Sequence, residues 1–246
     1  MTILHGDCLD VLDQVPIGTV RLAYADPPFN TGKTRKGLRG SEARYPDAFD
    51  DYVGWLMPRI EKVVERLTPD GSILLHLDAR EVHYVKVAMD RLLGRDHFIN
   101  EIVWAYDYGG RSRSHWSRKH DTILWYVRDP RRYVFDIEAS DRIPYMAPGL
   151  VGPAKTARGK TPTDVHWHTV CPTQGPERTG YPTQKPLGLL RRLVAVHSEI
   201  GDLVLDPFAG SGTTAVAAHQ QGRHYIAIDE STEAVRVMHE RLLTTT

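Results

Sequence analysis

The sequence of 246 residues contains only two cysteines, Cys8 and Cys171, and no long apolar run. A small secreted domain held together by disulfides uses more cysteines, so we expect a cytoplasmic protein. No stretch reaches the roughly 20 apolar residues that cross a bilayer. Residues 1–7 carry neither the basic nor the apolar region of a secretory signal. These absences argue against a disulfide-stapled secreted fold and predict that no membrane is a partner.

The chain also lacks a net charge, with 31 Lys and Arg against 31 Asp and Glu. The charges are unevenly distributed, because residues 104–192 hold 15 basic against 8 acidic residues and the remainder holds 16 against 23. A neutral protein polarised in this way can present a basic face to phosphates. The asymmetry therefore favours a nucleic-acid partner modestly, with a solvated basic loop region as the alternative.

Apolar periodicity predicts an alternation of strands and helices. Short apolar runs predict strands at 20–25, 72–77, 101–104, 122–127, 203–205 and 224–228. Helical spacing predicts helices at 52–67, 79–93, 186–198, 213–221 and 232–243. This alternation is typical of an α/β fold with a doubly wound, mostly parallel sheet. Between residues 128 and 183 Pro and Gly become dense and the periodicity fades, which indicates an irregular insertion.

A glycine-rich stretch, residues 206–213 (Asp-Pro-Phe-Ala-Gly-Ser-Gly-Thr), follows the apolar strand 203–205 and opens a helix. Its glycines let the backbone pass close to a ligand, and the first amides of the helix face polar groups of that ligand. Asp229 ends the next strand, where an acid can accept both hydroxyls of a ribose. No lysine follows to meet phosphates, so a sulfonium nucleoside with a carboxylate tail fits better than a dinucleotide or triphosphate. A ligand-free turn is the alternative, which the order strand, loop, helix, strand and acid disfavours.

A second motif, Asp26-Pro27-Pro28-Phe29-Asn30, follows strand 20–25 at the carboxyl edge of the sheet, where open α/β folds bind ligands. The exocyclic amine of a base is a poor nucleophile because its lone pair is conjugated with the ring. The Asp26 carboxylate and the Pro27 carbonyl can accept its hydrogens and free that lone pair. The prolines stiffen the turn, Phe29 offers a face for an extruded base, and Asn30 braces the turn. A turn that merely ends a strand is the alternative, disfavoured by the pairing with the glycine loop.

These motifs resemble those of the amino-methylating DNA methyltransferases. Residues 26–29 resemble the catalytic motif, residues 208–212 (Phe-Ala-Gly-Ser-Gly) resemble the S-adenosylmethionine loop, and residues 180–187 (Gly-Tyr-Pro-Thr-Gln-Lys-Pro-Leu) are similar to a segment that contacts the methionine end of the cofactor. A catalytic motif that precedes the cofactor loop, with target recognition between them, is the arrangement of the β group. The resemblance covers nearly the whole chain except about residues 128–179. It implies a Rossmann-like methyltransferase fold in permuted order.

The resemblance also implies roles for single residues. Asp7 accepts a hydrogen bond from the cofactor adenine, Asp229 holds the ribose, and Thr183 and Lys185 lie near the methionine carboxylate. Ala209 stands where many relatives carry Cys, a departure that should not affect the chemistry. The expected cofactor-binding residues are Asp7, Cys8, Asp26, Thr183, Lys185, Asp206, Phe208, Ala209, Gly210, Ser211, Gly212, Thr213, Asp229 and Glu230.

Two basic clusters are candidates for contact with DNA. They occupy residues 33–40, directly after the catalytic motif, and residues 111–120, where cations, hydroxyls and an aromatic mix. The candidate residues are Lys33, Arg35, Lys36, Arg39, Arg111, Arg113, Arg118 and Lys119. For each of these residues, a place in an exposed polar loop that does not contact DNA explains the sequence equally well. His166, His168 and Cys171 match no common zinc spacing, so we expect no metal.

We therefore expect one methyltransferase domain over residues 1–246, with the catalytic motif in 1–103, a target-recognition insertion at about 104–180 and cofactor binding at about 181–246. The resemblance implies a site-specific DNA methyltransferase that moves a methyl group from S-adenosylmethionine to the N6 amine of a flipped-out adenine and leaves S-adenosylhomocysteine. Asp26 favours adenine, because relatives that act on the N4 amine of cytosine more often begin the motif with Ser. The N4 amine remains the nearest alternative; an RNA or protein-glutamine methyltransferase and an inactive DNA-binding relative are less favoured.

Double-stranded DNA is the expected partner. The sequence does not decide whether the protein forms a homodimer, or whether it has a cognate endonuclease in a restriction-modification system.

Overall fold

One eight-stranded sheet organises the computed structural model, which describes residues 1–37, 41–172 and 174–245. The strands β1, β10, β9, β2 and β5 are parallel neighbours in that order, whereas β7 runs antiparallel to β5 and β6, and β8 lies parallel to β6 at the edge. In sheet order the strands are β1 (Thr2–His5), β10 (His224–Asp229), β9 (Leu203–Asp206), β2 (Val20–Ala25), β5 (Leu67–Leu77), β7 (His120–Val127), β6 (Phe98–Ala105) and β8 (Val165–Trp167). The expected mostly parallel sheet is confirmed.

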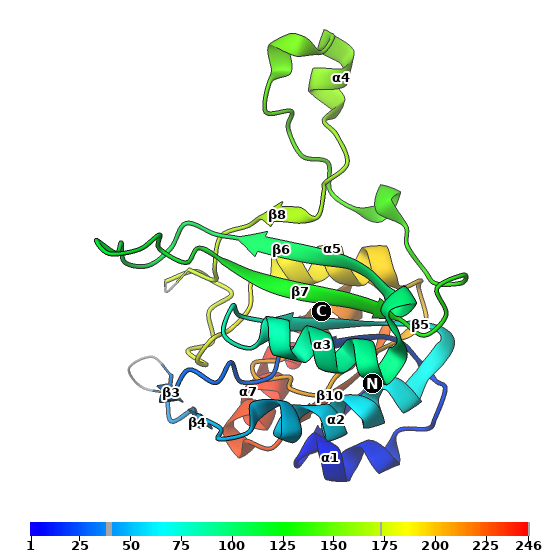
Figure 1. Ribbon diagram of the computed structural model, residues 1–246, viewed down its shortest axis with the longest axis vertical. Helices are drawn as coiled ribbons and strands as arrows, with labels where there is room; N and C mark the ends of the chain where they lie inside the picture. The colour runs from blue at the N-terminus through cyan, green and yellow to red at the C-terminus, as the bar shows by residue number, and fades with distance from the viewer. Residues whose placement is uncertain (38–40, 173, 246) are drawn as a thin grey trace.

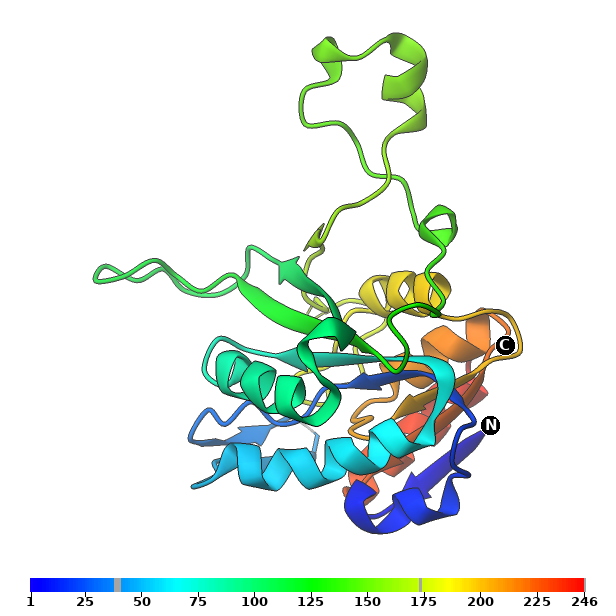
Figure 2. The same cartoon turned by 45° about the vertical axis from the view of Figure 1, so that its right-hand side comes forward.

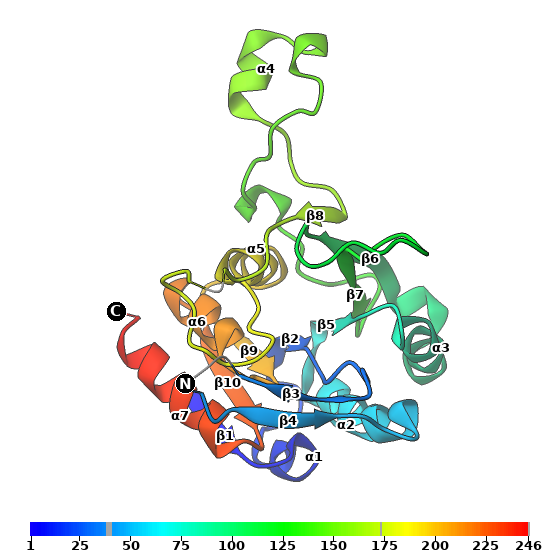
Figure 3. The same ribbon diagram turned by 90° about the vertical axis from the view of Figure 1, so that its left-hand side faces the viewer.

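Helices cover both faces of the sheet, as Figures 1 and 3 show. One face packs on α1 (Cys8–Val11), α2 (Tyr52–Arg66) and α3 (Val82–Leu93), and the other on α5 (Leu187–His197), α6 (Thr213–Gln220) and α7 (Thr232–Leu243). In α2 the fully buried residues Leu56, Ile60 and Val63 recur at helical spacing. Burial of each such side chain contributes roughly 1.5–3 kcal/mol. The doubly wound arrangement is therefore built largely from helices that the sequence pattern predicts; α1 is not among them, and α6 is buried along most of its length rather than on one face.

Several element boundaries differ from the sequence-based prediction, and two of the differences, in β5 and α3, can be traced to local contacts. Strand β5 begins at Leu67 rather than residue 72. Residues 68–71, which include the Pro-Asp-Gly sequence, cause a register shift in the pairing of β5 with β2 but do not interrupt the strand. Helix α3 begins at Val82 rather than residue 79, because the Asp78 carboxylate accepts a hydrogen bond from the Arg80 amide, 2.9 Å, and holds a turn ahead of the helix. Both differences come from local hydrogen bonding that apolar periodicity does not report.

A hairpin that periodicity did not predict follows the catalytic motif. Strands β3 (Lys33–Lys36) and β4 (Arg44–Asp47) pair antiparallel, with Arg35 opposite Tyr45. The strands are short and polar, so they show no apolar alternation. Residues 38–40, and with them Arg39, lie outside the described residues.

Two segments project from the body of the molecule (Figures 1 and 2). The first is the connection between β6 and β7, residues 106–119, which we call the β6–β7 arm; the second, residues 136–164, carries α4 (Pro153–Arg158). Strands β7 and β8, which belong to the sheet, lie within residues 104–180, where we expect target recognition. None of the helices in the described ranges has the length and apolar character needed to cross a membrane.

The start of α6 depends on glycine. Gly212 has φ +74°, and a Cβ there would lie 2.6 Å from Cγ of Met238 in α7. Gly18 has φ +72°, and a Cβ there would meet nothing within 4 Å, so a substitution at Gly18 tests the backbone strain alone. We expect Gly212→Ala to lose about 1–3 kcal/mol more of the free energy of unfolding than Gly18→Ala. Urea denaturation of both variants measures the difference, and an equal loss would contradict this account of Gly212.

Candidate active site

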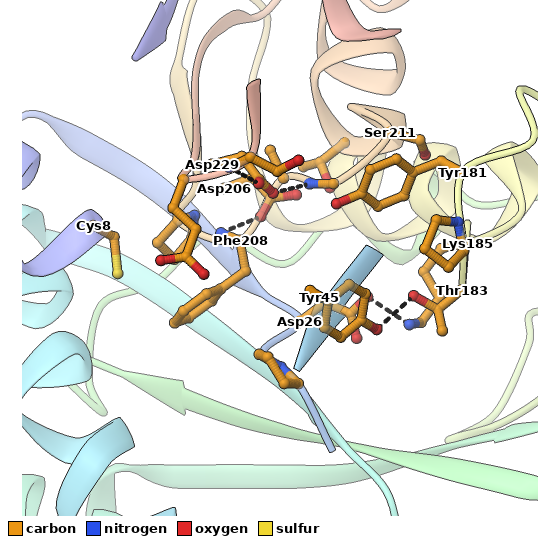
Figure 4. A pocket seen from close by; sticks show the side chains of 18 of the residues that line it. Cys8, Asp26, Tyr45, Tyr181, Thr183, Lys185, Asp206, Phe208, Ser211 and Asp229 are labelled. Carbon is orange, nitrogen blue, oxygen red and sulfur yellow. Dashed lines mark hydrogen bonds and ion pairs between the residues drawn. The ribbon is translucent and has the colours of Figure 1, made fainter. Parts of the chain in front are cut away.

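The carboxyl ends of four adjacent parallel strands meet at one edge of the sheet. Asp7 follows β1, Asp26 follows β2, and Asp206 and Asp229 are the last residues of β9 and β10. All four line one cavity of about 520 Å³. Figure 4 shows Asp26, Asp206 and Asp229 in this cavity. This volume lies within the range of small-molecule and cofactor sites.

Nearly every residue expected to bind a cofactor lines this cavity. They are Asp7, Cys8, Asp26, Thr183, Lys185, Asp206, Phe208, Ala209, Gly210, Ser211, Thr213, Asp229 and Glu230. Gly212 does not line it, because its left-handed backbone places it at the N-cap of α6, where it faces Met238 of α7. The cavity thus joins the glycine loop to the Asp26 turn, although the two are far apart in the sequence.

The glycine loop is closed against the end of β10 by a carboxylate. Oδ2 of Asp229 accepts a hydrogen bond from the Gly210 amide, 2.8 Å, and Oδ1 accepts one from the Ser231 amide, 2.9 Å. Gly210 has φ +51°, and a Cβ there would lie 3.1 Å from the ring of Tyr181. A side chain at position 210 would therefore press on the cavity wall, as expected where backbone must approach a ligand.

Two of the four carboxyl groups, those of Asp206 and Asp229, form no ion pair within the part of the chain that the structure describes. Burial raises the pKa of Asp229 to about 6, although it accepts hydrogen bonds from two backbone amides. Burial also raises the pKa of Asp206 to about 7, against hydrogen bonds from Thr214 and the Phe208 amide. Desolvation disfavours the charged form of each group. The floor of the cavity is therefore acidic and titrates near neutral pH.

The carboxyl group of Asp7 lies in a different environment. Burial acts to raise its pKa, but hydrogen bonds from the Arg59 guanidinium and the Leu9 amide outweigh it, so the pKa lies below its usual value. Nε of Arg59 lies 3.0 Å from Oδ1, and Nη2 lies 2.5 Å from Oδ2. Next to Asp7, burial raises the pKa of the Cys8 thiol to about 12. Asp7 therefore presents an ionised carboxylate to the cavity, already held by one cation.

The Asp-Pro-Pro-Phe-Asn turn is braced from several sides. The Tyr52 hydroxyl donates to the Pro28 carbonyl, 2.6 Å. Asn30, at φ +53°, donates from Nδ2 to Oε1 of Glu81, 2.7 Å, and accepts from the Phe49 amide, 2.8 Å. These two hydrogen bonds of the Asn30 side chain brace the turn, as expected from the sequence. The turn is held from outside, which leaves the Asp26 side chain to the cavity.

Asp26 is paired with Lys185, which the resemblance had placed near the cofactor carboxylate instead. Nζ of Lys185 lies 2.5 Å from Oδ2 of Asp26 and 4.9 Å from the ring centroid of Phe29. Oδ1 of Asp26 is buried and accepts no hydrogen bond within the described residues. Nδ1 of His76, a fully buried residue, lies 4.0 Å from it. One carboxylate oxygen is therefore held by a cation while the other is unpaired.

The candidate DNA-contacting residues are divided between the hairpin and the β6–β7 arm. In the hairpin, Lys33 and Lys36 are exposed, whereas Arg35 pairs with the buried Asp47 at 3.0 Å and lines a small pocket of about 20 Å³ beside Asp26. In the arm, Arg111, Arg113 and Arg118 are exposed, whereas Lys119 donates to backbone carbonyls of the arm itself. Pro27 and Phe29 line the same small pocket as Arg35.

Several residues of the cavity escaped the sequence analysis. Tyr45, Trp55, Arg59 and Tyr181 line it. Tyr181 belongs to residues 180–187, which resemble a cofactor-contacting segment, so the sequence could have identified it as a cavity residue. The other three lie on β4 and α2, where no motif marks them, and only packing brings them to the strand ends.

Comparisons with known proteins bear on this geometry. The family model N6_N4_Mtase, described as DNA methylase, matches residues 20–240. DNA adenine methyltransferase YhdJ of Escherichia coli (strain K12) is 32% identical over 252 residues, with 98% of this chain and 82% of that protein covered. Type II methyltransferase M.ScaI of Streptomyces caespitosus is 31% identical over 240 residues, with 92% and 75% covered.

Solved structures agree on the fold. The PvuII DNA methyltransferase (cytosine-N4-specific) superposes with a TM-score of 0.72 at 17% identity, with 98% of this chain and 85% of that chain covered. The M1.HpyAVI–SAM complex gives a TM-score of 0.68 at 22% identity, with 98% of each chain covered. Because the family model spans most of the chain and two relatives exceed 30% identity over nearly all of it, the chain belongs to the DNA methylase family of N6 and N4 methyltransferases.

Proposed function

We propose that this chain transfers a methyl group from S-adenosylmethionine to the N6 amine of adenine in double-stranded DNA. The observation that carries the proposal is the single cavity in which the glycine loop and the Asp26 turn meet. One end suits a nucleoside, and the other suits an exocyclic amine. A cofactor and a base can therefore lie in contact within one space.

The residues of the cavity fit S-adenosylmethionine. The backbone of Gly210 leaves a space that a side chain would fill, and acids stand at the ends of β9 and β10. A cavity rich in carboxylates favours a positively charged ligand. Asp229 would hold the ribose, Asp7 the adenine, and Thr183 and Ser211 the methionine end. When bound, S-adenosylmethionine supplies an electrophilic methyl group.

The chain's own part in the chemistry is to position the amine. Asp26 and the Pro27 carbonyl accept hydrogens of the exocyclic amine and thereby free its lone pair for attack. Lys185 holds one oxygen of Asp26, while Oδ1 is without a partner among the described residues. Phe29, on the same turn, offers a ring against which the extruded base stacks.

The target base is the finer part of the proposal. Support for adenine comes from Asp26 at the head of the motif and from the relative named as a DNA adenine methyltransferase. The second candidate is the N4 amine of cytosine, favoured by the shared fold of the enzyme named as cytosine-N4-specific. The same two acceptors serve either amine.

We further propose that residues 104–180 select the target sequence and that Arg111, Arg113 and Arg118 contact the phosphates of the DNA.

The base can be identified directly. The purified protein is incubated with S-adenosylmethionine and unmethylated duplex DNA of mixed sequence, and the digested nucleosides are separated by mass spectrometry. We expect N6-methyladenine. N4-methylcytosine would instead support the second candidate, and the absence of both modified nucleosides would contradict the proposal.

Asp26 should be required for transfer and dispensable for cofactor binding. We expect Asp26→Ala to lower kcat by at least about 10²-fold, because an interaction made with the reacting amine is lost. Affinity for S-adenosylhomocysteine, measured by calorimetry, should change only a few-fold. Asp96→Ala, at an exposed carboxylate before the amino end of β6, is the matched control and should keep full activity. Retained activity in Asp26→Ala would rule out the assigned role.

The titration of Asp229 should appear in cofactor affinity. Its pKa of about 6 in the free protein means that the carboxylate is progressively protonated below that pH. Ribose hydroxyls donate to the ionised form, so affinity for S-adenosylhomocysteine should fall by up to about tenfold per pH unit below pH 6. Calorimetry between pH 5 and 7 measures this fall in the wild type.

Two variants separate Asp229 from its neighbour. Asp229→Asn should bind more weakly at pH 7 and lose the fall below pH 6. Asp206→Asn removes the other raised carboxyl group, with its pKa of about 7, and should keep the fall. The same pH dependence in Asp229→Asn and the wild type would disprove the ribose-binding role.

A further inference from the structure

The β6–β7 arm presents a tryptophan to solvent. Trp116 is 97% exposed, whereas Trp104 and Trp125, in the two strands from which the arm extends, are 3% and 4% exposed. An indole buries a large apolar area when it finds a partner. Tryptophan is highly buried on average in folded proteins. The arm thus displays the kind of side chain that proteins usually bury.

The arm holds this tryptophan in a defined turn. The Ser112 amide donates to Oγ of Ser117, 2.8 Å, and Nδ1 of His115 lies 3.0 Å from the Ser112 hydroxyl. Nearer the sheet, Nζ of Lys119 donates to the carbonyls of Tyr108 and Gly109 at 2.7 and 2.9 Å. Hydrogen bonds on both sides of Trp116 therefore fix the backbone that carries it. The side chain is presented at a low cost in conformational entropy.

Three arginines of the arm lie within five positions of Trp116 in the sequence. Arg111, Arg113 and Arg118 are exposed, and within the described ranges none of them forms an ion pair. The arm has one acid, Asp107, whose carboxylate lies 3.9 Å from Nζ of Lys119. Exposed arginines without carboxylate partners are suited to phosphates. An aromatic ring among them is suited to bases, since every base has a face for stacking.

The arm begins at the edge of the sheet that carries the cavity. Strand β7 is antiparallel to both β5 and β6, so β6 ends at the same edge as β2 and β5. At the root of the arm the Trp104 ring lies 5.6 Å from that of His76, whose Nδ1 is 4.0 Å from Asp26. Figure 1 shows the arm reaching out on the same side as the β3–β4 hairpin. A duplex that delivers a base to Asp26 therefore meets the arm.

We propose that Trp116 inserts into duplex DNA and fills the gap left when the target base leaves the helix. This inference rests on the proposed function, since it takes DNA as the substrate. Removal of a base from the stack costs a few kcal/mol in lost stacking and pairing. An inserted aromatic side chain restores stacking on the exposed neighbours. Arg111, Arg113 and Arg118 hold the DNA backbone on either side of the gap.

Other exposed apolar side chains are less suited to this position. Met146 and Leu150, 96% and 88% exposed, lie on the separate projecting segment with α4 and have no ring to stack. Trp167, 74% exposed, is part of β8 in register with Ala105 at the root of the arm. Only Trp116 among these combines an aromatic ring, a position out on the arm and neighbouring arginines that form no ion pair within the described residues.

The test uses a gap that exists before the protein binds. Two short fluorescein-labelled duplexes are identical except that one has a single abasic site, and fluorescence anisotropy gives the affinity of the wild type and variants for each. The wild type should prefer the abasic duplex by about fivefold or more, because the indole gains stacking there without extruding a base. Trp116→Ala should bind both duplexes equally. Trp116→Phe, which keeps a ring, should retain most of the preference.

A matched control and a second readout make the result decisive. Ile200 is 80% exposed but precedes β9 at the opposite edge of the sheet, so Ile200→Ala should keep the wild-type preference. Affinity for S-adenosylhomocysteine should match the wild type in every variant, as evidence of intact folding. Either an undiminished preference for the abasic duplex in Trp116→Ala or an equal loss of affinity for both duplexes would overturn the proposed insertion. Either result would leave the proposed function intact if the wild type methylates DNA. Failure of the wild type to bind either duplex would instead refute the proposed function.

Discussion

The crowding of acidic side chains at one edge of a parallel sheet is the constraint on which this structure depends. Parallel neighbours end together, so Asp7, Asp26, Asp206 and Asp229 are brought to the rim of a single cavity. Carboxylates that approach one another and lose water are destabilised unless cations or hydrogen-bond donors compensate them. The surrounding loops and helices supply that compensation, and the way in which they do so divides the cavity into unlike regions.

Cations compensate two of these acids and hydrogen-bond donors the other two. Arg59 from α2 pairs with Asp7, and Lys185, just ahead of α5, pairs with Asp26. Asp229 accepts hydrogen bonds from two backbone amides, and Asp206 accepts them from the Thr214 side chain and the Phe208 amide; burial leaves the pKa of each near neutrality. The region near Asp229 can therefore attract a cationic ligand and respond to pH. The region near Asp26 instead holds its carboxylate in one orientation, as positioning of an amine requires.

The sequence predicted the two motifs and their meeting better than it predicted their surroundings. An apolar strand followed by an acid and a turn recurs at Asp26 and Asp206, and strands of a parallel sheet end at one edge, so a shared site followed from the pattern alone. Gly212 was expected at the ligand but packs on Met238, because glycine is needed both near ligands and where helices approach closely. The β3–β4 hairpin was missed because its strands carry no apolar alternation.

Local pattern was enough for the alternation of strands and helices, the order of the motifs and the acids at the strand ends, because these depend on residues close together in the chain. Tertiary packing decided which cation neutralises which acid. Lys185 pairs with Asp26 across 159 positions and Arg59 with Asp7 across 52, and no spacing in the sequence encodes either distance. It also decided that Trp104 and Trp125 are buried while Trp116 is exposed. Burial depends on where an element lies relative to the sheet, and residue type alone does not contain that information.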